Sequence, residues 1–204
     1  MTTYLYVLSI GPVQGFIAAA RRTRDLWIGS HLLSEISKAA ARKISDMSDE
    51  RGRLIFPSLE KDKLKPSELP DAPNVANIIL AELELSDGQD PHEIDQQVKE
   101  AAQGEWMQYA KGAKWLAENG PGGFKVSALW DDQVNDVLEF YSAWIQVPGD
   151  DYDYSNTRKR LMRLLDGRKS IRDFIQEEER DLGLPKSSLD GARDSVLPKN
   201  IDDI

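Results

Sequence analysis

Runs of apolar residues along the chain predict one buried β-strand and three further strand candidates. Thr3–Ile10 is a β-branched and aromatic run with almost no polar interruption, and Gly11-Pro12 ends it. The other candidates follow in chain order: Leu54–Phe56, Val75–Leu83 and Tyr141–Val147.

Between these runs, apolar residues recur with the period of an α-helix. Val13, Phe16, Ile17 and Ala20 share one face, and a second helical stretch continues to about Ile44. Further helices are expected over His92–Leu116, Val134–Phe140 and Asn156–Ile175. Asp46–Arg53 is expected to be a polar turn, Glu60–Pro73 a loop, and the last thirty or so residues a polar tail.

The element order is strand, helices, strand, strand, helix, helix, strand, helix. It predicts an α+β fold of the ferredoxin-like βαββαβ type, with helices on one face of an antiparallel sheet. A doubly wound parallel sheet is the alternative, and the long helices and few strands disfavour it. We expect one domain over residues 1–150, followed over 151–204 by a helical extension and a polar tail.

The amino-acid composition excludes several kinds of active site. The 204 residues carry a formal charge of −9, which argues against a free-standing nucleic-acid binder but not against a local basic patch. The chain has no cysteine, so thiolate metal sites, disulfides and cysteine nucleophiles are excluded. With only His31 and His92, it cannot build a multi-histidine metal centre or a histidine–aspartate nuclease site by itself.

No segment has the sequence of a membrane-spanning helix. The most apolar stretch, Tyr4–Ala20, is interrupted by glycine, proline and glutamine and is too short. Ala18–Ala20 resembles a signal-peptide cleavage site, but no basic residue precedes the apolar run. We therefore expect a cytoplasmic protein with no membrane partner.

The junction Ser9–Gly15 is the segment most suggestive of chemistry. A strand ends there and a helix begins, and the free N–H groups of a helix start favour an anion. Gly11 and Gly15 allow close approach by a phosphate, and Arg21, Arg22 and Arg24 follow shortly after. The motif matches no known phosphate-binding fingerprint, so an ordinary glycine-proline turn is the competing interpretation.

The run from Ile10 to Ser37 closely resembles the first palm-like domain in the large subunit of type III-B CRISPR effector (Cmr) complexes. The matching motifs are Gly11-Pro12-Val13-Gln14, Phe16-Ile17, Ala20-Arg21, Arg24-Asp25-Leu26-Trp27, Gly29-Ser30 and Leu32-Leu33-Ser34. Weaker similarities occur at Pro73-Asn74, Trp144–Pro148, Arg168-Lys169, Phe174 and Lys186–Gly191.

This resemblance implies a nucleotide-cyclase-related palm that faces a second palm, binds ATP between the two, and makes cyclic oligoadenylates when target RNA is bound. The second palm would hold the Mg or Mn ions, and the first would be degenerate. The implied nucleotide-binding residues are Gly11, Pro12, Val13, Gln14, Gly15, Phe16 and Ser30. The implied partners are the second palm, other effector subunits, and guide and target RNA through the complex.

The chain resembles the first palm only, so we expect a fragment, a truncated product or one half of a split subunit. We expect no catalytic or metal-binding residue in it, and we expect the isolated chain to be inactive. We also expect the turn 11–15 to lie at a sheet edge, with its N–H groups and Ser30 facing one concavity.

Other candidates have simpler interpretations. Asp150-Asp151 could hold a metal, but the flanking residues favour a solvated turn. We interpret His31 as a helix-surface or packed histidine, His92 as exposed and Asp25 as an ion-pair partner.

A basic helix near the C-terminus contains Arg158, Lys159, Arg160, Arg163, Arg168, Lys169 and Arg172. It is either a solvated face paired with Glu177–Glu179 or a contact with a neighbouring subunit or guide RNA. For the whole chain, a purely structural module and, more weakly, a stand-alone phosphate-ligand enzyme remain alternatives.

Overall fold

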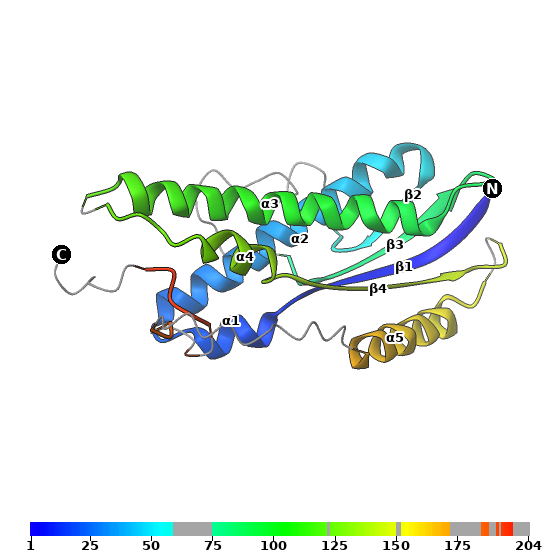
Figure 1. Cartoon of the computed structure of the whole chain (residues 1–204). Coiled ribbons are helices and arrows are strands. Elements are labelled where there is room, and N and C mark those ends of the chain that lie inside the picture. The colour runs from blue at the N-terminus through cyan, green and yellow to red at the C-terminus, as the bar shows by residue number, and fades with distance from the viewer. Residues whose placement is uncertain are drawn as a thin grey trace.

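A four-stranded antiparallel sheet lies at the centre of the molecule (Figure 1). The computed structural model describes residues 1–58, 75–121, 123–149, 152–171, 185–187, 191 and 193–197, the side chains of 48–52 excepted. The strands are β1 (Thr2–Gly11), β2 (Gly52–Phe56), β3 (Ile78–Leu85) and β4 (Glu139–Gln146). The helices are α1 (Val13–Ala19), α2 (Thr23–Arg51), α3 (Pro91–Asn119), α4 (Leu129–Asn135) and α5 (Tyr154–Ser170).

The strand order is β2-β3-β1-β4, so β1 and β3 are the inner strands. In the register, Tyr6 lies opposite Ala81 of β3 and Trp144 of β4. Strand order and helix placement are those of the ferredoxin-like βαββαβ fold, which confirms the predicted α+β class.

Strand β1 is buried on both faces. Tyr6, Leu8 and Ile10 pack with apolar residues of α2 and α3. Leu5 and Val7, which point the opposite way, pack with residues of α5. A strand covered on both sides has no polar face, which is why Thr3–Ile10 reads as a nearly continuous apolar run.

The helical extension at the C-terminus packs on the sheet. Figure 1 shows α2 and α3 on one side of the sheet and α5 on the other. Leu161 and Leu165 of α5 are fully buried against Leu5, Val7 and Val147. The two faces are thus covered by different parts of the chain, while the expected division at residue 150 stays a prediction.

Two local expectations were wrong. Asp46–Arg53 was expected to be a turn, but α2 continues to Arg51 and β2 begins at Gly52. Met47 packs against the core three residues after Ile44, so the helical period extends past Ile44. Val134–Phe140 was expected to be a helix, but α4 ends at Asn135 and β4 begins at Glu139. Val134 is buried on α4, whereas Phe140 packs from β4, so the apolar spacing that suggested one helix belongs to two elements.

Several expectations lie outside the described residues. They are the loop at Glu60–Pro73, Pro73-Asn74, Asp150-Asp151, the helix beyond residue 171 with Arg172 and Phe174, and Glu177–Glu179.

Candidate functional site

The glycine-proline turn lies at the end of the central strand. This corrects the expectation of a sheet edge, because β1 pairs with β3 on one side and with β4 on the other. Gly11 pairs with Glu139, and a Cβ on Gly11 would lie 3.5 Å from a carboxylate oxygen of that residue. Pro12 precedes α1 and provides no side-chain cap, so the first amides of α1 are left to solvent or a ligand.

Gly15 of α1 and Gly29 of α2 both have a packing role. A Cβ on Gly15 would lie 3.2 Å from the ring of Pro12. Gly29 is buried, and a Cβ there would lie 3.3 Å from the Cβ of Phe16. Gly29 therefore lets α1 pack closely on α2, and this contact brings the predicted segment 11–16 next to the helical turn that contains Ser30.

The hydroxyl of Ser30 has a partner within its own helix. Its Oγ donates to the carbonyl oxygen of Leu26 at 2.9 Å, and the residue is half-buried. A serine that back-bonds in this way still has lone pairs free to accept a hydrogen bond. The assignment of Ser30 as a nucleotide ligand stays a prediction.

Asp25 organises the connection between α1 and α2. Its Oδ2 accepts hydrogen bonds from the backbone N–H groups of Arg21 at 3.2 Å and Arg22 at 2.9 Å. Its Oδ1 lies 3.7 Å from Nε of Arg24. The ion-pair interpretation of Asp25 is confirmed, and the three arginine residues are exposed beside the turn.

Both histidines have aromatic neighbours. His31 is buried, stacks on Trp27 with ring centroids 5.3 Å apart, and meets the edge of Tyr109. His92 is exposed and lies edge-on to Trp144. These placements select the packed alternative for His31 over a helix-surface position and confirm that His92 is exposed.

Sequence reasoning missed a group of charged residues between α2 and α3. Nζ of Lys38 lies 2.6 Å from a carboxylate oxygen of Glu35, and both side chains are almost fully buried. Burial raises the pKa of Glu105, an effect that Arg42 opposes and Glu35 reinforces. The signal was available, because Glu35 and Lys38 interrupt the apolar face of α2 at i,i+3 spacing.

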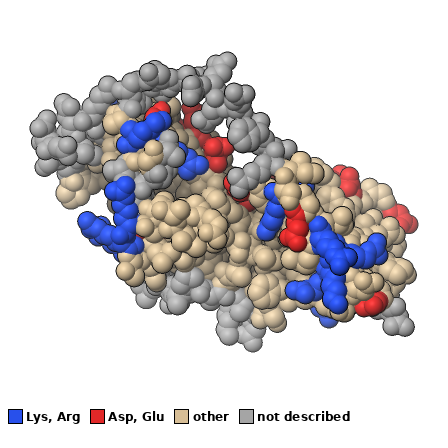
Figure 2. Space-filling model, turned by 90° about the horizontal axis from the view of Figure 1, so that it is seen from below, with Lys and Arg blue, Asp and Glu red and all other residues tan. Residues whose placement is uncertain are grey.

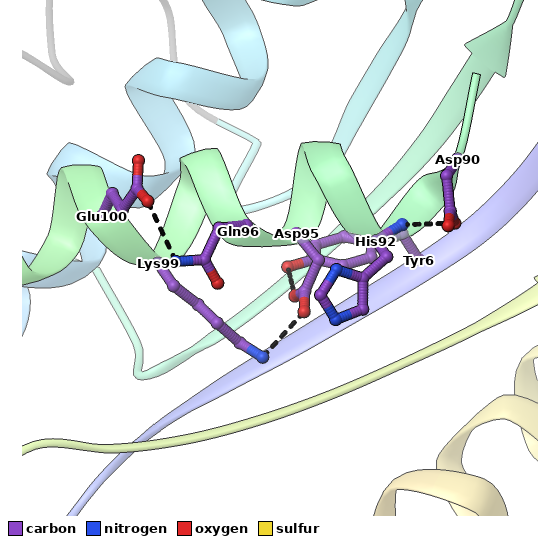
Figure 3. Close-up of polar contacts among 7 residues, drawn as sticks. All are labelled: Tyr6, Asp90, His92, Asp95, Gln96, Lys99 and Glu100. Carbon is purple, nitrogen blue, oxygen red and sulfur yellow. Dashed lines mark hydrogen bonds and ion pairs between the residues drawn. The ribbon is translucent and has the colours of Figure 1, made fainter.

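A second missed group joins the sheet to α3 (Figure 3). The phenol of Tyr6 donates to Oδ1 of Asp95 at 2.8 Å, and Nζ of Lys99 lies 2.7 Å from Oδ2. Asp95 is 3% exposed, so its charge depends on these partners. Burial and the Asp95 charge raise the pKa of Tyr6, which keeps the phenol protonated as a donor.

In the parts of the chain that the structure describes, no three acidic or histidine side chains come close enough together to hold a metal ion. No helix there is both long and apolar enough to cross a bilayer.

The observed geometry defines a ferredoxin-like α+β domain with an uncapped glycine-proline turn at the end of its central strand. The family described as CRISPR-associated protein Cmr2, N-terminal, matches residues 5–111, and the chain belongs to this family. The chain is also 27% identical over 195 residues to the CRISPR system Cmr subunit Cmr2 of Pyrococcus furiosus. That match covers 89% of this chain and 22% of the relative, so the chain spans about a fifth of the relative's length.

Proposed function

We propose that this chain is the first, non-catalytic palm-like domain of a Cmr large subunit and contributes half of an ATP site for cyclic oligoadenylate synthesis. The observation that carries the proposal is the contact of Phe16 with Gly29. It packs α1, which follows the turn, against the part of α2 that contains Ser30. The resemblance described above supplies the choice of ATP.

In this proposal the chain binds rather than reacts. The backbone N–H groups of the turn stabilise phosphate charge, and the exposed Arg21, Arg22 and Arg24 add long-range attraction. A second palm holds the Mg or Mn ions, which polarise the phosphates when they are bound. Other effector subunits, and guide and target RNA in the complex, complete the proposed partners, and a cytoplasmic location stays a prediction.

A purely structural role is the second candidate, and two observations favour it. Gly15 and Gly29 are both explained by packing, and the Ser30 hydroxyl already donates to Leu26. Under this alternative the turn only fixes α1 against α2, and ATP does not bind.

Titration of the ¹⁵N-labelled chain with ATP separates the two candidates. Shifts in the amide signals of residues 11–16 and of Ser30 support the nucleotide site. Ser30→Ala should then weaken ATP binding by about threefold to tenfold, as expected for one hydrogen bond. Ser170→Ala is the matched control, because the Ser170 hydroxyl also bonds back within its helix, to Asp166 at 2.9 Å. The absence of localised shifts at saturating ATP would leave the structural role.

Activity is tested by incubating the chain with ATP and Mg²⁺ or Mn²⁺, with and without RNA. No oligoadenylate is expected, because phosphoryl transfer needs metal ions aligned on the phosphates. Product that disappears in Asp150→Asn/Asp151→Asn would overturn the non-catalytic assignment.

A further inference from the structure

Helix α5 is amphipathic, with an apolar side on the sheet and a basic side in solvent. Thr157, Leu161 and Leu165 recur every four residues and are buried. Lys159 and Arg163 lie on the opposite side of the helix and Arg160 on its flank, and all three are exposed. We call these three residues the α5 basic face.

The charges of the α5 basic face are not balanced locally. Helix α5 has six basic residues and one acidic residue, in a chain whose formal charge is −9. Within the described parts of the chain, no ion pair reaches Lys159, Arg160 or Arg163. Like charges at i,i+3 and i,i+4 destabilise a helix by about 0.2–0.5 kcal/mol per pair, so this arrangement disfavours the isolated helix.

The neighbouring residues leave room for a ligand backbone. Asn156, Gly167 and Ser170 lie along the same side of α5 as the basic face, as does Asp166, the one acidic residue of the helix, and all four are exposed. Figure 2 shows basic side chains gathered on one part of this surface. Long cations that flank small or amide side chains suit a phosphodiester strand, because the cations reach phosphates while the amide can bond a ribose 2′-hydroxyl.

We infer that the α5 basic face binds the phosphate backbone of single-stranded RNA without reading its sequence. The choice of RNA rests on the proposed function, whereas the anion-binding face rests on the geometry of α5 alone. If the three side chains each contact one phosphate, a plot of the logarithm of RNA affinity against the logarithm of salt concentration should have a slope of about −2. Affinity should then drop about 20-fold when salt is raised from about 50 to about 200 mM.

The probe is a fluorescein-labelled oligouridylate of about 20 nucleotides, and the readout is fluorescence anisotropy with the 204-residue chain. The triple variant Lys159→Gln/Arg160→Gln/Arg163→Gln should lose at least about tenfold in affinity at about 50 mM salt, and its salt slope should approach zero. The control triple Lys111→Gln/Lys114→Gln/Lys125→Gln removes the same charge from α3 and the segment after it and should bind like the wild type. Circular dichroism verifies that both variants fold.

Three outcomes would overturn the inference. The first is that the wild-type chain shows no saturable RNA binding at low salt. The second is that both triple variants lose the same amount of RNA affinity. The third is that an oligothymidylate of the same length binds equally tightly, which would remove the assignment to RNA. ATP titration of the same samples keeps the two proposals apart. The α5 triple should retain any ATP-induced shifts at residues 11–16, so either proposal can fail without the other.

Discussion

The Tyr6–Asp95 hydrogen bond is the buried polar contact with the clearest energetic consequence. Tyr6→Phe should destabilise the fold by about 1–3 kcal/mol, because the nearly inaccessible Asp95 carboxylate loses a donor and keeps its desolvation penalty. The measurement is urea unfolding. Tyr4→Phe is the control, since Tyr4 contributes to the same face of β1 and its hydroxyl makes no hydrogen bond with any described residue. Equal losses in both variants would mean that the hydrogen bond contributes nothing.

Glu105 should make stability depend on pH. Its pKa is raised above the ordinary 4.5, chiefly by burial, so the folded state holds a proton that the unfolded state has already released. The free energy of unfolding should therefore fall as pH rises from about 4.5 through the raised pKa. Glu105→Gln should flatten this part of the curve in urea titrations at several pH values. Glu118→Gln removes one charge from an exposed position of the same helix, and an identical flattening there would argue against the role of Glu105.

The docking of α5 can be tested with two leucines of the same helix. Leu161→Ala should cost about 2–5 kcal/mol, because it opens a cavity between α5 and the sheet. Leu164 is 52% exposed, and Leu164→Ala should change stability by no more than about 0.5 kcal/mol. Chemical unfolding measures both. If Leu161→Ala were equally mild, α5 would be a loosely attached appendage.

Helices and strands were predictable where one period dominated. The periodicity of α3 was clear and predicted its extent within a few residues, and the runs that became β1 and β3 were found because buried strands are almost entirely apolar. The run that became β4 was found although most of its residues are only half-buried. The α4–β4 junction was misread because Val134 of α4 and Phe140 of β4 are both shielded from solvent, and the spacing of these apolar residues from two elements imitated one helix. The packing of α5 on the second face of the sheet could not be predicted from its amphipathic pattern, because that pattern shows which side of the helix is buried but not what it packs against.

The candidate site was only partly predictable. Sequence placed the turn at a strand end next to a helix, and the structure agrees. It could not show that Phe16 fills the space beside Gly29, nor that the Ser30 hydroxyl bonds within its helix, because both depend on how α1 lies against α2. Asp95 was overlooked because an acidic residue at a helix start normally faces solvent, and only its tertiary contact with Tyr6 buries it.

The sheet topology predicts how the molecule opens. Strand β1 is hydrogen-bonded on both sides and buried on both faces, whereas β2 is a five-residue strand at the end of the sheet. Amide hydrogen exchange followed by mass spectrometry should therefore be slowest in β1, faster in β2, and fastest in α1, which buries no residue. Exchange in β1 as fast as in α1 would contradict this ordering.

Because β1 is buried on both faces, its apolar residues alone do not determine its register against β3 and β4. A slip of one residue would exchange Leu5 and Val7 for Tyr6 and Leu8, and the strand would still bury apolar side chains in both layers. Such a slip would turn the Tyr6 hydroxyl away from Asp95 and into the layer beneath α5, breaking a buried hydrogen bond. The Tyr6 phenol thus favours one strand register over another that would bury apolar side chains nearly as well.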